Sequence, residues 1–161
     1  MIEFSIEPAT EPSTASQKPQ TMNNTTIMNE STVSPFKAKD PITCHVLDQT
    51  TGRPAPSINA SLTLIRPLGP SAPFTALTNN DGRIVNWNQP DGPSLNEIFE
   101  NLREHADGRM VWELKFDSGA YFGEGRTFFP EVVVKFFVEN SIHYHVPLLL
   151  GPYSYTTYRG S

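Results

Sequence analysis

Hydrophobic and polar residues alternate along several short segments beyond residue 40, which is the pattern of half-buried β-strands. Residues 110–116 show it most clearly, because Glu113 and Lys115 interrupt a row of large apolar side chains at every second position. The same texture predicts further strands, separated by turns, over residues 42–47, 58–66, 131–138, 144–150 and 153–158. Short strands with Gly- and Pro-rich turns predict an all-β sandwich of about seven to eight strands.

One segment departs from this alternation and has the periodicity of a helix. Ser94 and Glu97 have the spacing of a capping box, in which each side chain caps the backbone amide of the other. The apolar residues that follow share one helical face, at Leu95, Ile98, Phe99 and Leu102. We therefore expect one short helix that packs on the sandwich and ends at Asp107-Gly108.

Residues 1–39 differ in composition from the rest of the chain. From Glu7 to Thr32 the chain is rich in Pro, Ser, Thr, Asn, Gln and Glu, with hardly any large apolar side chain. Such a segment buries too little surface to offset the entropy of ordering. We therefore predict a disordered N-terminal extension over residues 1–39 and one folded domain over residues 40–161.

Composition and charge exclude several classes of protein. The chain has 161 residues, 1 Cys and a net charge of −5, without a cluster of Lys and Arg. One cysteine makes no internal disulfide, and a surface for nucleic acid or anionic lipid needs a basic patch. No apolar run reaches about 18 residues, and residues 1–39 lack the pattern of a secretory signal. We expect a cytoplasmic protein, with the peroxisome as the alternative, that binds neither nucleic acid nor membrane.

The histidines are the first candidates for chemistry. His143 and His145 lie two residues apart on a predicted strand and share a face, and with His45 they would make a three-histidine zinc set. A His-x-His pair alone is a weak signal, so we expect no metal and keep zinc as an alternative. Cys44 precedes His45, but neighbours on a strand point to opposite faces, so we expect a buried Cys44 and no Cys–His dyad.

The C-terminus is a second candidate. Tyr158, Arg159, Gly160 and Ser161 follow the last predicted strand directly, with no polar tail. A terminal serine carries both a hydroxyl and a carboxylate, and a strand fixed in a sheet would hold both in place. A frayed end is the alternative, and these residues alone leave the two open.

Two segments of the chain resemble the signatures of the transthyretin-like proteins. HVLD at residues 45–48, followed by GRPA at 52–55, is similar to the opening signature of that family. HYHVPLLL at 143–150, followed by PYSYTTYRGS at 152–161, resembles the closing signature nearly residue for residue. The resemblance covers about residues 42–161 and implies a transthyretin-like β-sandwich.

Within that family the resemblance points to the enzyme branch, the 5-hydroxyisourate hydrolases. These enzymes carry His, Arg and His at three positions, where this chain has His45, Arg83 and His145, and they end in Tyr-Arg-Gly-Ser. The implied activity is hydrolysis of a cyclic amide C–N bond in 5-hydroxyisourate, giving 2-oxo-4-hydroxy-4-carboxy-5-ureidoimidazoline in urate degradation. The alternative is a transthyretin-like carrier that binds a small aromatic ligand without catalysis.

The resemblance also implies roles for individual residues. The implied catalytic residues are His45, Arg83, His145 and Ser161, and the implied substrate-binding residues are His45, Arg83, Tyr158, Arg159 and Gly160. His45 would activate water as a general base, and Arg83 would hold an oxygen that becomes negatively charged. Which of the two histidines is the base stays open. The family further implies no cofactor and a homotetramer with its sites between two dimers.

Overall fold

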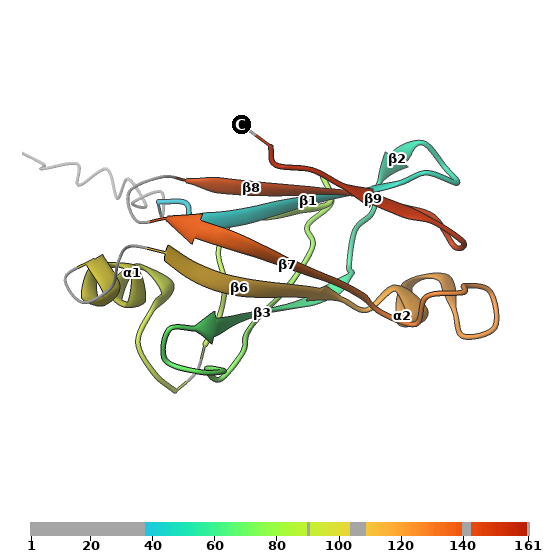
Figure 1. The fold of residues 1–161 in the computed structure, drawn as a ribbon. Coiled ribbons are helices and arrows are strands. Elements are labelled where there is room, and N and C mark those ends of the chain that lie inside the picture. The colour runs from blue at the N-terminus through green and yellow to red at the C-terminus, as the bar shows by residue number, and fades with distance from the viewer. Residues whose placement is uncertain (1–37, 90, 104–108, 140–142, 161) are drawn as a thin grey trace, which may run out of the picture. The chain divides into compact units, whose positions relative to one another are not determined.

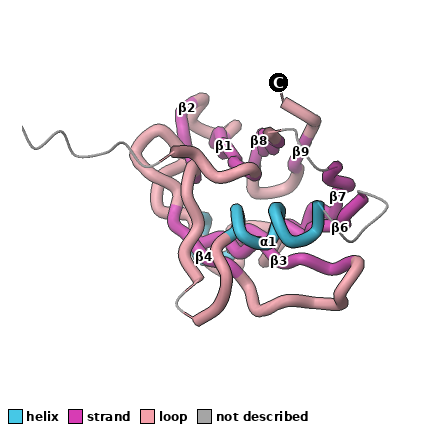
Figure 2. The backbone as a smooth tube through the Cα atoms, turned by 90° about the vertical axis from the view of Figure 1, so that its left-hand side faces the viewer, coloured by secondary structure: helices cyan, strands magenta, loops and turns pink. Residues whose placement is uncertain are grey.

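Two β-sheets, here called sheet A and sheet B, stack face to face in the computed structural model (Figure 1). Sheet A consists of β1 (Ile42–Asp48), β2 (Arg53–Pro54), β5 (Arg83–Ile84), β8 (Tyr144–Leu150) and β9 (Tyr155–Thr157). Sheet B consists of β3 (Asn59–Arg66), β4 (Phe74–Leu77), β6 (Arg109–Phe116) and β7 (Val132–Glu139). Figure 2 shows the two rows of strands, in the orders β2-β1-β8-β9 and β4-β3-β6-β7. The predicted all-β sandwich is confirmed.

The structure describes residues 38–89, 91–103, 109–139 and 143–160. Most of the predicted N-terminal extension, the predicted end of the helix at Asp107-Gly108 and the terminal Ser161 lie outside the described residues. Those three expectations, and the domain boundary at residue 40, therefore stay predictions. Within the described part of the chain, no helix has the length and apolar character needed to cross a membrane.

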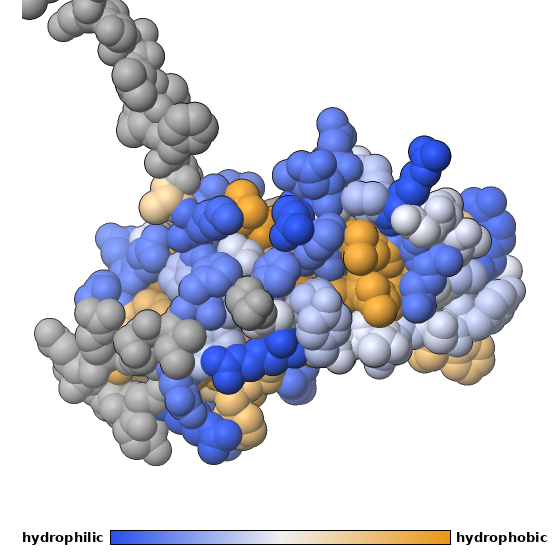
Figure 3. All heavy atoms as spheres, turned by 90° about the horizontal axis from the view of Figure 1, so that it is seen from above, coloured by the Kyte–Doolittle hydropathy of each residue, from blue (hydrophilic) through white to orange (hydrophobic). Residues whose placement is uncertain are grey.

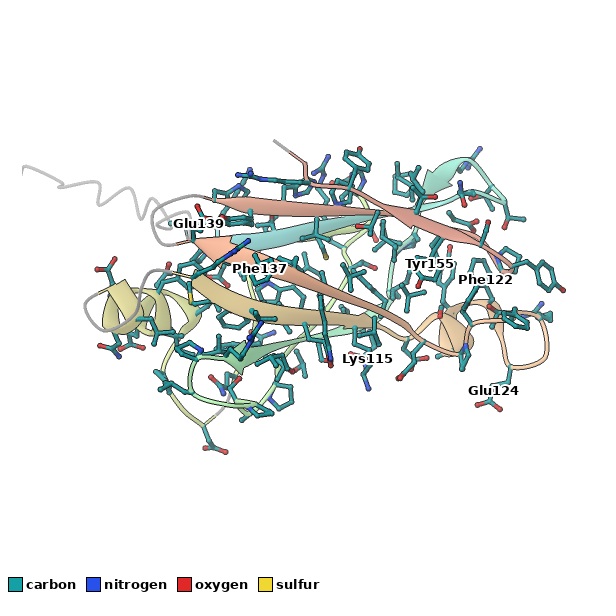
Figure 4. The ribbon with its side chains drawn as sticks, in the orientation of Figure 1. Lys115, Phe122, Glu124, Phe137, Glu139 and Tyr155 are labelled. Carbon is teal, nitrogen blue, oxygen red and sulfur yellow. The ribbon has the colours of Figure 1, made fainter. Side chains whose placement is uncertain are left out.

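The alternating apolar and polar residues of the strands point to opposite faces, the apolar ones into the core and the polar ones to the surface. In β6 the buried residues Met110, Trp112, Leu114 and Phe116 point between the sheets, while Lys115 points outward and is exposed. Burying a large apolar side chain of this kind stabilises the fold by roughly 1.5–3 kcal/mol. Figure 4 shows such side chains filling the space between the sheets, with Lys115 outside it. Sheet A follows the same rule, which leaves its odd-numbered residues of β1 and β8 on the outer face.

The predicted helix is present as α1 (Leu95–Arg103). Its capping box is formed, since the Ser94 amide donates to Glu97 Oε2 at 2.7 Å and the Glu97 amide donates to Ser94 Oγ at 3.3 Å. The Phe99 ring stacks on the Trp112 ring with centroids 5.9 Å apart, so α1 packs on the core with the face that the sequence predicted.

Four elements of the described chain were not predicted. β2 and β5 have 2 residues each, too few to show alternation. β4 follows a Pro-rich turn, and α2 (Ser118–Phe122) has 5 residues, too few for helical periodicity. Asp117 holds α2 in place, because its Oδ1 accepts a hydrogen bond from the Ala120 amide at 2.9 Å.

The turn before β5 depends on the one residue type that fits it. Gly82 has φ 69°, and a Cβ there would overlap the carbonyl oxygen of Val46 in β1. The Val46 amide in turn donates to the Gly82 carbonyl at 2.8 Å. Glycine therefore lets the turn close directly on β1 and set Arg83 opposite His45.

Gly82→Ala should destabilise the fold by more than about 2 kcal/mol, because backbone strain and a steric overlap add together. Gly52→Ala is the matched control, since Gly52 has φ 67° but nothing within 4 Å of its would-be Cβ. The free energy of unfolding of that variant should fall by only about 1–2 kcal/mol, because it suffers the backbone strain but no steric overlap. Urea unfolding followed by tryptophan fluorescence measures both. Equal unfolding midpoints for the two variants would contradict the overlap with β1.

Candidate active site

Three of the predicted site residues meet on the outer face of sheet A. His45 of β1 lies directly opposite Arg83 of β5, and His145 of β8 lies on the other side of β1. The imidazole centroids of His45 and His145 are 6.4 Å apart, with the rings tilted by 36°. Figure 3, which looks onto sheet A from above, shows a face that is mostly hydrophilic with smaller hydrophobic patches. Residues far apart in the sequence are thus gathered on one open surface.

A side-chain-stabilised turn positions Arg83. Asn79 Oδ1 accepts hydrogen bonds from the Asp81 amide at 3.0 Å and from the Arg83 amide at 2.9 Å. The turn contains Asn80-Asp81-Gly82, residue types that favour tight turns. The Arg83 side chain is exposed, and no ion pair within the described residues involves it. Its guanidinium is therefore available to a ligand on this face.

The environment of His45 favours a neutral imidazole. Burial and then the nearby charge of Arg83 lower the pKa of His45 below 6.5, while Asp81 acts in the opposite direction. Its Nε2 is buried and has no hydrogen-bond partner among the described protein groups. A neutral imidazole with an unshared nitrogen can accept a proton from water at neutral pH.

His145 is also held neutral. Its pKa lies below 6.5 because of burial first and then the charges of Arg83, His45, His143 and Lys39. Nδ1 of His145 lies 2.9 Å from the Thr43 hydroxyl, which leaves Nε2 to face a ligand. The two imidazoles therefore differ in their partners: one is tied to a side chain of β1, and the other is not.

The C-terminal segment lies directly against His145. The Gly160 amide donates to the His145 carbonyl at 2.9 Å, and a Cβ on Gly160 would come within 2.8 Å of His145 Cδ2. The Arg159 guanidinium sits 5.2 Å from the centroid of the Tyr144 ring. Glycine thus allows the chain to approach the imidazole, and the described part of the C-terminus is bonded to the sheet. Ser161 itself lies outside the described residues.

A cavity of about 260 Å³ joins part of the predicted site. Its walls include His145, Tyr158 and Arg159 together with residues of β7, but neither His45 nor Arg83. Tyr158 is 58% exposed at this opening. His145 therefore belongs both to the cluster on the outer face and to the cavity. A larger cavity of about 380 Å³ is lined by Lys115, Glu131 and other residues of the sheet B side, and no histidine lines it.

Thr43 is a site residue that the sequence interpretation missed. Its hydroxyl lies 2.9 Å from His145 Nδ1 and 3.1 Å from His143 Nε2, so it is bonded to both members of the His-x-His pair. Thr43 stands two residues before His45 and shares its face of β1, which was the only signal in the sequence. The partners themselves became visible only with the register of β1 against β8.

The alternatives built on Cys44 and on zinc have different outcomes. Cys44 is fully buried on the inner face of β1, and burial raises the pKa of its thiol to about 12. The prediction of a buried cysteine is confirmed, and Cys44 points to the opposite face of β1 from His45. As for zinc, the described part of the chain contains no cluster of three or more His, Cys, Asp or Glu that could hold a metal ion.

The amino-acid sequence is similar to those of known proteins. The model of a family described as "HIUase/Transthyretin family" matches residues 42–160. A 5-hydroxyisourate hydrolase of Salmonella dublin is 38% identical over 124 residues, which cover 74% of this chain and 80% of the relative.

Two solved structures share the fold. A Klebsiella pneumoniae 5-hydroxyisourate hydrolase is 27% identical with a TM-score of 0.53, over 74% of this chain and 97% of that one. A sea bream transthyretin in complex with thyroxine is 26% identical with a TM-score of 0.59, over 74% of this chain and 94% of that one.

Arg83→Gln should raise the pKa of both His45 and His145 toward 6.5, because the Arg83 charge lowers both. Arg83→Lys keeps the charge and is the matched control, so it should leave both values lowered. Proton NMR titration of the imidazole ring signals measures this without any substrate. Unchanged titration of both histidines in Arg83→Gln would contradict the electrostatic coupling.

Proposed function

The chain belongs to the HIUase/Transthyretin family, and we propose that it hydrolyses 5-hydroxyisourate in urate degradation. The reaction opens the six-membered ring at an amide-type C–N bond. The observation that carries this function is the pair of neutral imidazoles, His45 and His145, beside the guanidinium of Arg83 on one face of sheet A. A carrier of an apolar aromatic ligand gains nothing from three polar groups at this place, because burying them without partners is unfavourable.

In the mechanism that we propose, His45 removes a proton from the attacking water. The lowered pKa and the unshared Nε2 support this role, since a base must be neutral and must have a free lone pair. The oxygen of the water then adds to the ring carbonyl carbon, whose own oxygen becomes negatively charged. Arg83, always protonated and exposed on the same face, suits that oxygen as a forked hydrogen-bond donor.

His145 completes the reaction in this proposal. When the C–N bond breaks, the leaving nitrogen needs a proton. His145 can supply it from its protonated form and then returns to the neutral ring that its lowered pKa favours. Tyr158, Arg159 and Gly160 would position the substrate from the C-terminal side, which their contacts with His145 and its cavity support. Ser161 is proposed for the same purpose from the family resemblance alone.

His45→Ala should lower the turnover of 5-hydroxyisourate by roughly 10²- to 10⁴-fold, the contribution of acid–base catalysis. The substrate is generated with urate oxidase, and the loss of its ultraviolet absorbance is followed with and without the protein. Lys115→Ala, on the outer face of sheet B, should hydrolyse the substrate at the wild-type rate.

The same assay separates the enzyme from the carrier. Wild-type protein that binds a fluorescent aromatic ligand but does not accelerate the loss of absorbance would refute the hydrolase function. A His45→Ala variant with the wild-type rate would refute only the assignment of the base.

We further propose a homotetramer of two dimers with the sites between the dimers. Two groups of exposed large side chains support association, since contiguous apolar patches mark protein interfaces. Phe137 and Tyr158 line one cavity, and Phe128 and Tyr155 both contact the Phe129 ring. β7 and β9 are each paired on one side only among the described strands. The outer face of sheet A, with His45 and His145, is open to a second layer. The cytoplasmic location stays a prediction from the sequence.

Specific activity should fall when the protein is diluted below the concentration at which the tetramer dissociates, because each site would lose a wall. Mass photometry gives the fraction of tetramer, and the absorbance assay gives the rate on the same samples. Reconcentrating the diluted sample is the control and should restore both quantities. Monomers with full specific activity would contradict sites shared between subunits.

A further inference from the structure

We propose that the Thr43 hydroxyl relays a proton between the imidazoles of His145 and His143, and so connects the active site to solvent. The inference rests on the proposed function, because it gives His145 a route along which its proton is exchanged between turnovers. It assigns roles to Thr43 and His143 that neither the His-Arg-His set nor the C-terminal segment includes.

The backbone holds the three groups in one row. Thr43 of β1 pairs with His145 of β8 in parallel register, and the Tyr144 amide donates to the Pro41 carbonyl at 2.8 Å, which fixes the start of β8 beside β1. The Thr43 oxygen then lies 2.9 Å from His145 Nδ1 and 3.1 Å from His143 Nε2. Both distances are those of good hydrogen bonds.

A proton relay needs a shielded middle group and an outer group in contact with solvent, and the burial of the three residues meets both conditions. Thr43 is 3% exposed, His145 is partly buried, and His143 is exposed. The middle group is thus shielded from water, which would otherwise compete for its hydrogen bonds, while the outer imidazole can exchange protons with solvent. The Tyr144 carbonyl is also near the hydroxyl, but at 3.5 Å it is a poorer acceptor than either imidazole nitrogen.

A hydroxyl has one hydrogen and can accept another, so its direction sets the tautomer of His145. If Thr43 donates to His145 Nδ1, then neutral His145 carries its hydrogen on Nε2 and donates a hydrogen bond to the substrate. If Thr43 instead donates to His143 Nε2, it accepts from His145 Nδ1–H, and His145 Nε2 becomes a base. Reversing the hydroxyl therefore converts neutral His145 between a hydrogen-bond donor and a base toward the substrate.

The proton balance of the relay is complete without another reactant. Starting with His145 protonated on both nitrogens, the Nδ1 proton moves to Thr43 Oγ1 while the original hydroxyl proton moves to His143 Nε2. The Thr43 hydroxyl is regenerated, His145 becomes neutral, and His143 becomes a cation. His143 then releases its Nδ1 proton to water. The reverse sequence loads His145 with a proton.

The charges around His145 favour movement of the proton outward. Arg83, His45, His143 and Lys39 all face His145 and, with burial, disfavour its protonated form. A proton that arrives on His145 is therefore held weakly, and His143 at the surface is joined to it through the Thr43 hydroxyl.

The test compares four variants. Thr43→Val removes the hydroxyl but keeps the branched shape and the strand preference, and Thr43→Ser keeps the hydroxyl. His143→Gln keeps a hydrogen-bonding side chain that cannot carry a proton. Thr63→Val makes the same Thr-to-Val change in β3 of the other sheet and is the matched control. Each variant is assayed for kcat and KM at low and high concentrations of imidazole buffer.

We expect Thr43→Val and His143→Gln to lower kcat by about tenfold at low buffer concentration, with little change in KM. This loss is a part of the ~10²- to 10⁴-fold rate enhancement that acid–base catalysis supplies. Added imidazole should restore their kcat, because a free base replaces the relay. Thr43→Ser should recover most of the rate, and Thr63→Val should match the wild type. A Thr43→Val rate equal to wild type at low buffer, or a loss that neither imidazole nor Thr43→Ser repairs, would overturn the relay.

A substrate-free measurement separates failure of the relay from failure of the hydrolase function. The ¹⁵N chemical shifts of the His145 ring report which nitrogen carries the hydrogen. They should change when His143 is titrated in wild-type protein and in Thr43→Ser, and should not respond to that titration in Thr43→Val. If the wild type shows no hydrolysis but this coupling is present, the proposed function fails and the relay stands. If Thr43→Val retains the coupling, the relay fails whatever the activity.

Discussion

The parallel pairing of β1 with β8 is the constraint on which the site depends. It sets Thr43 opposite His145 and His45 opposite Pro147, so both imidazoles leave the sheet on the same face. Because side chains alternate along a strand, a slip of one residue in either strand would turn its imidazole into the core. The buried residues Cys44 and Val146 on the opposite face oppose such a slip. Core packing therefore keeps both imidazoles on the outer face of sheet A.

The strands most visible in the sequence were those with one buried face. The alternation over residues 110–116 and 144–150 appeared as β6 and β8 almost to the residue, and the capping box placed the start of α1. The elements that escaped prediction are held by contacts from elsewhere. β5, with 2 residues, exists because the Gly82 turn lies against Val46. α2 is tied to the chain beyond it, because Ser118 Oγ donates to the Phe129 carbonyl and the Gly119 amide donates to the Pro130 carbonyl. No local pattern in the sequence encodes these contacts.

The candidate site was predictable in its members but not in its connections. Family resemblance named His45, Arg83 and His145, and the structure brings them to one face. Thr43 was not identified, because its hydrogen bond to His145 joins positions 102 residues apart. That bond depends on the parallel pairing of β1 with β8, which the sequence did not predict. The cavity wall at Tyr158 and Arg159 is another such case, since residues of β7 line the same cavity although β7 belongs to the other sheet.

The features that suit the imidazoles to catalysis also act on stability. Burial and the charge of Arg83 lower the pKa of His45 and His145 below 6.5, which keeps both rings neutral near pH 7. Between those lowered values and 6.5 the unfolded chain binds protons that the folded chain does not. The free energy of unfolding contributed by these groups therefore falls as the pH decreases through that window, and it is unaffected above it. A site that works with neutral imidazoles at neutral pH thus weakens the folded state in acid, and the hydrophobic core behind sheet A offsets that loss.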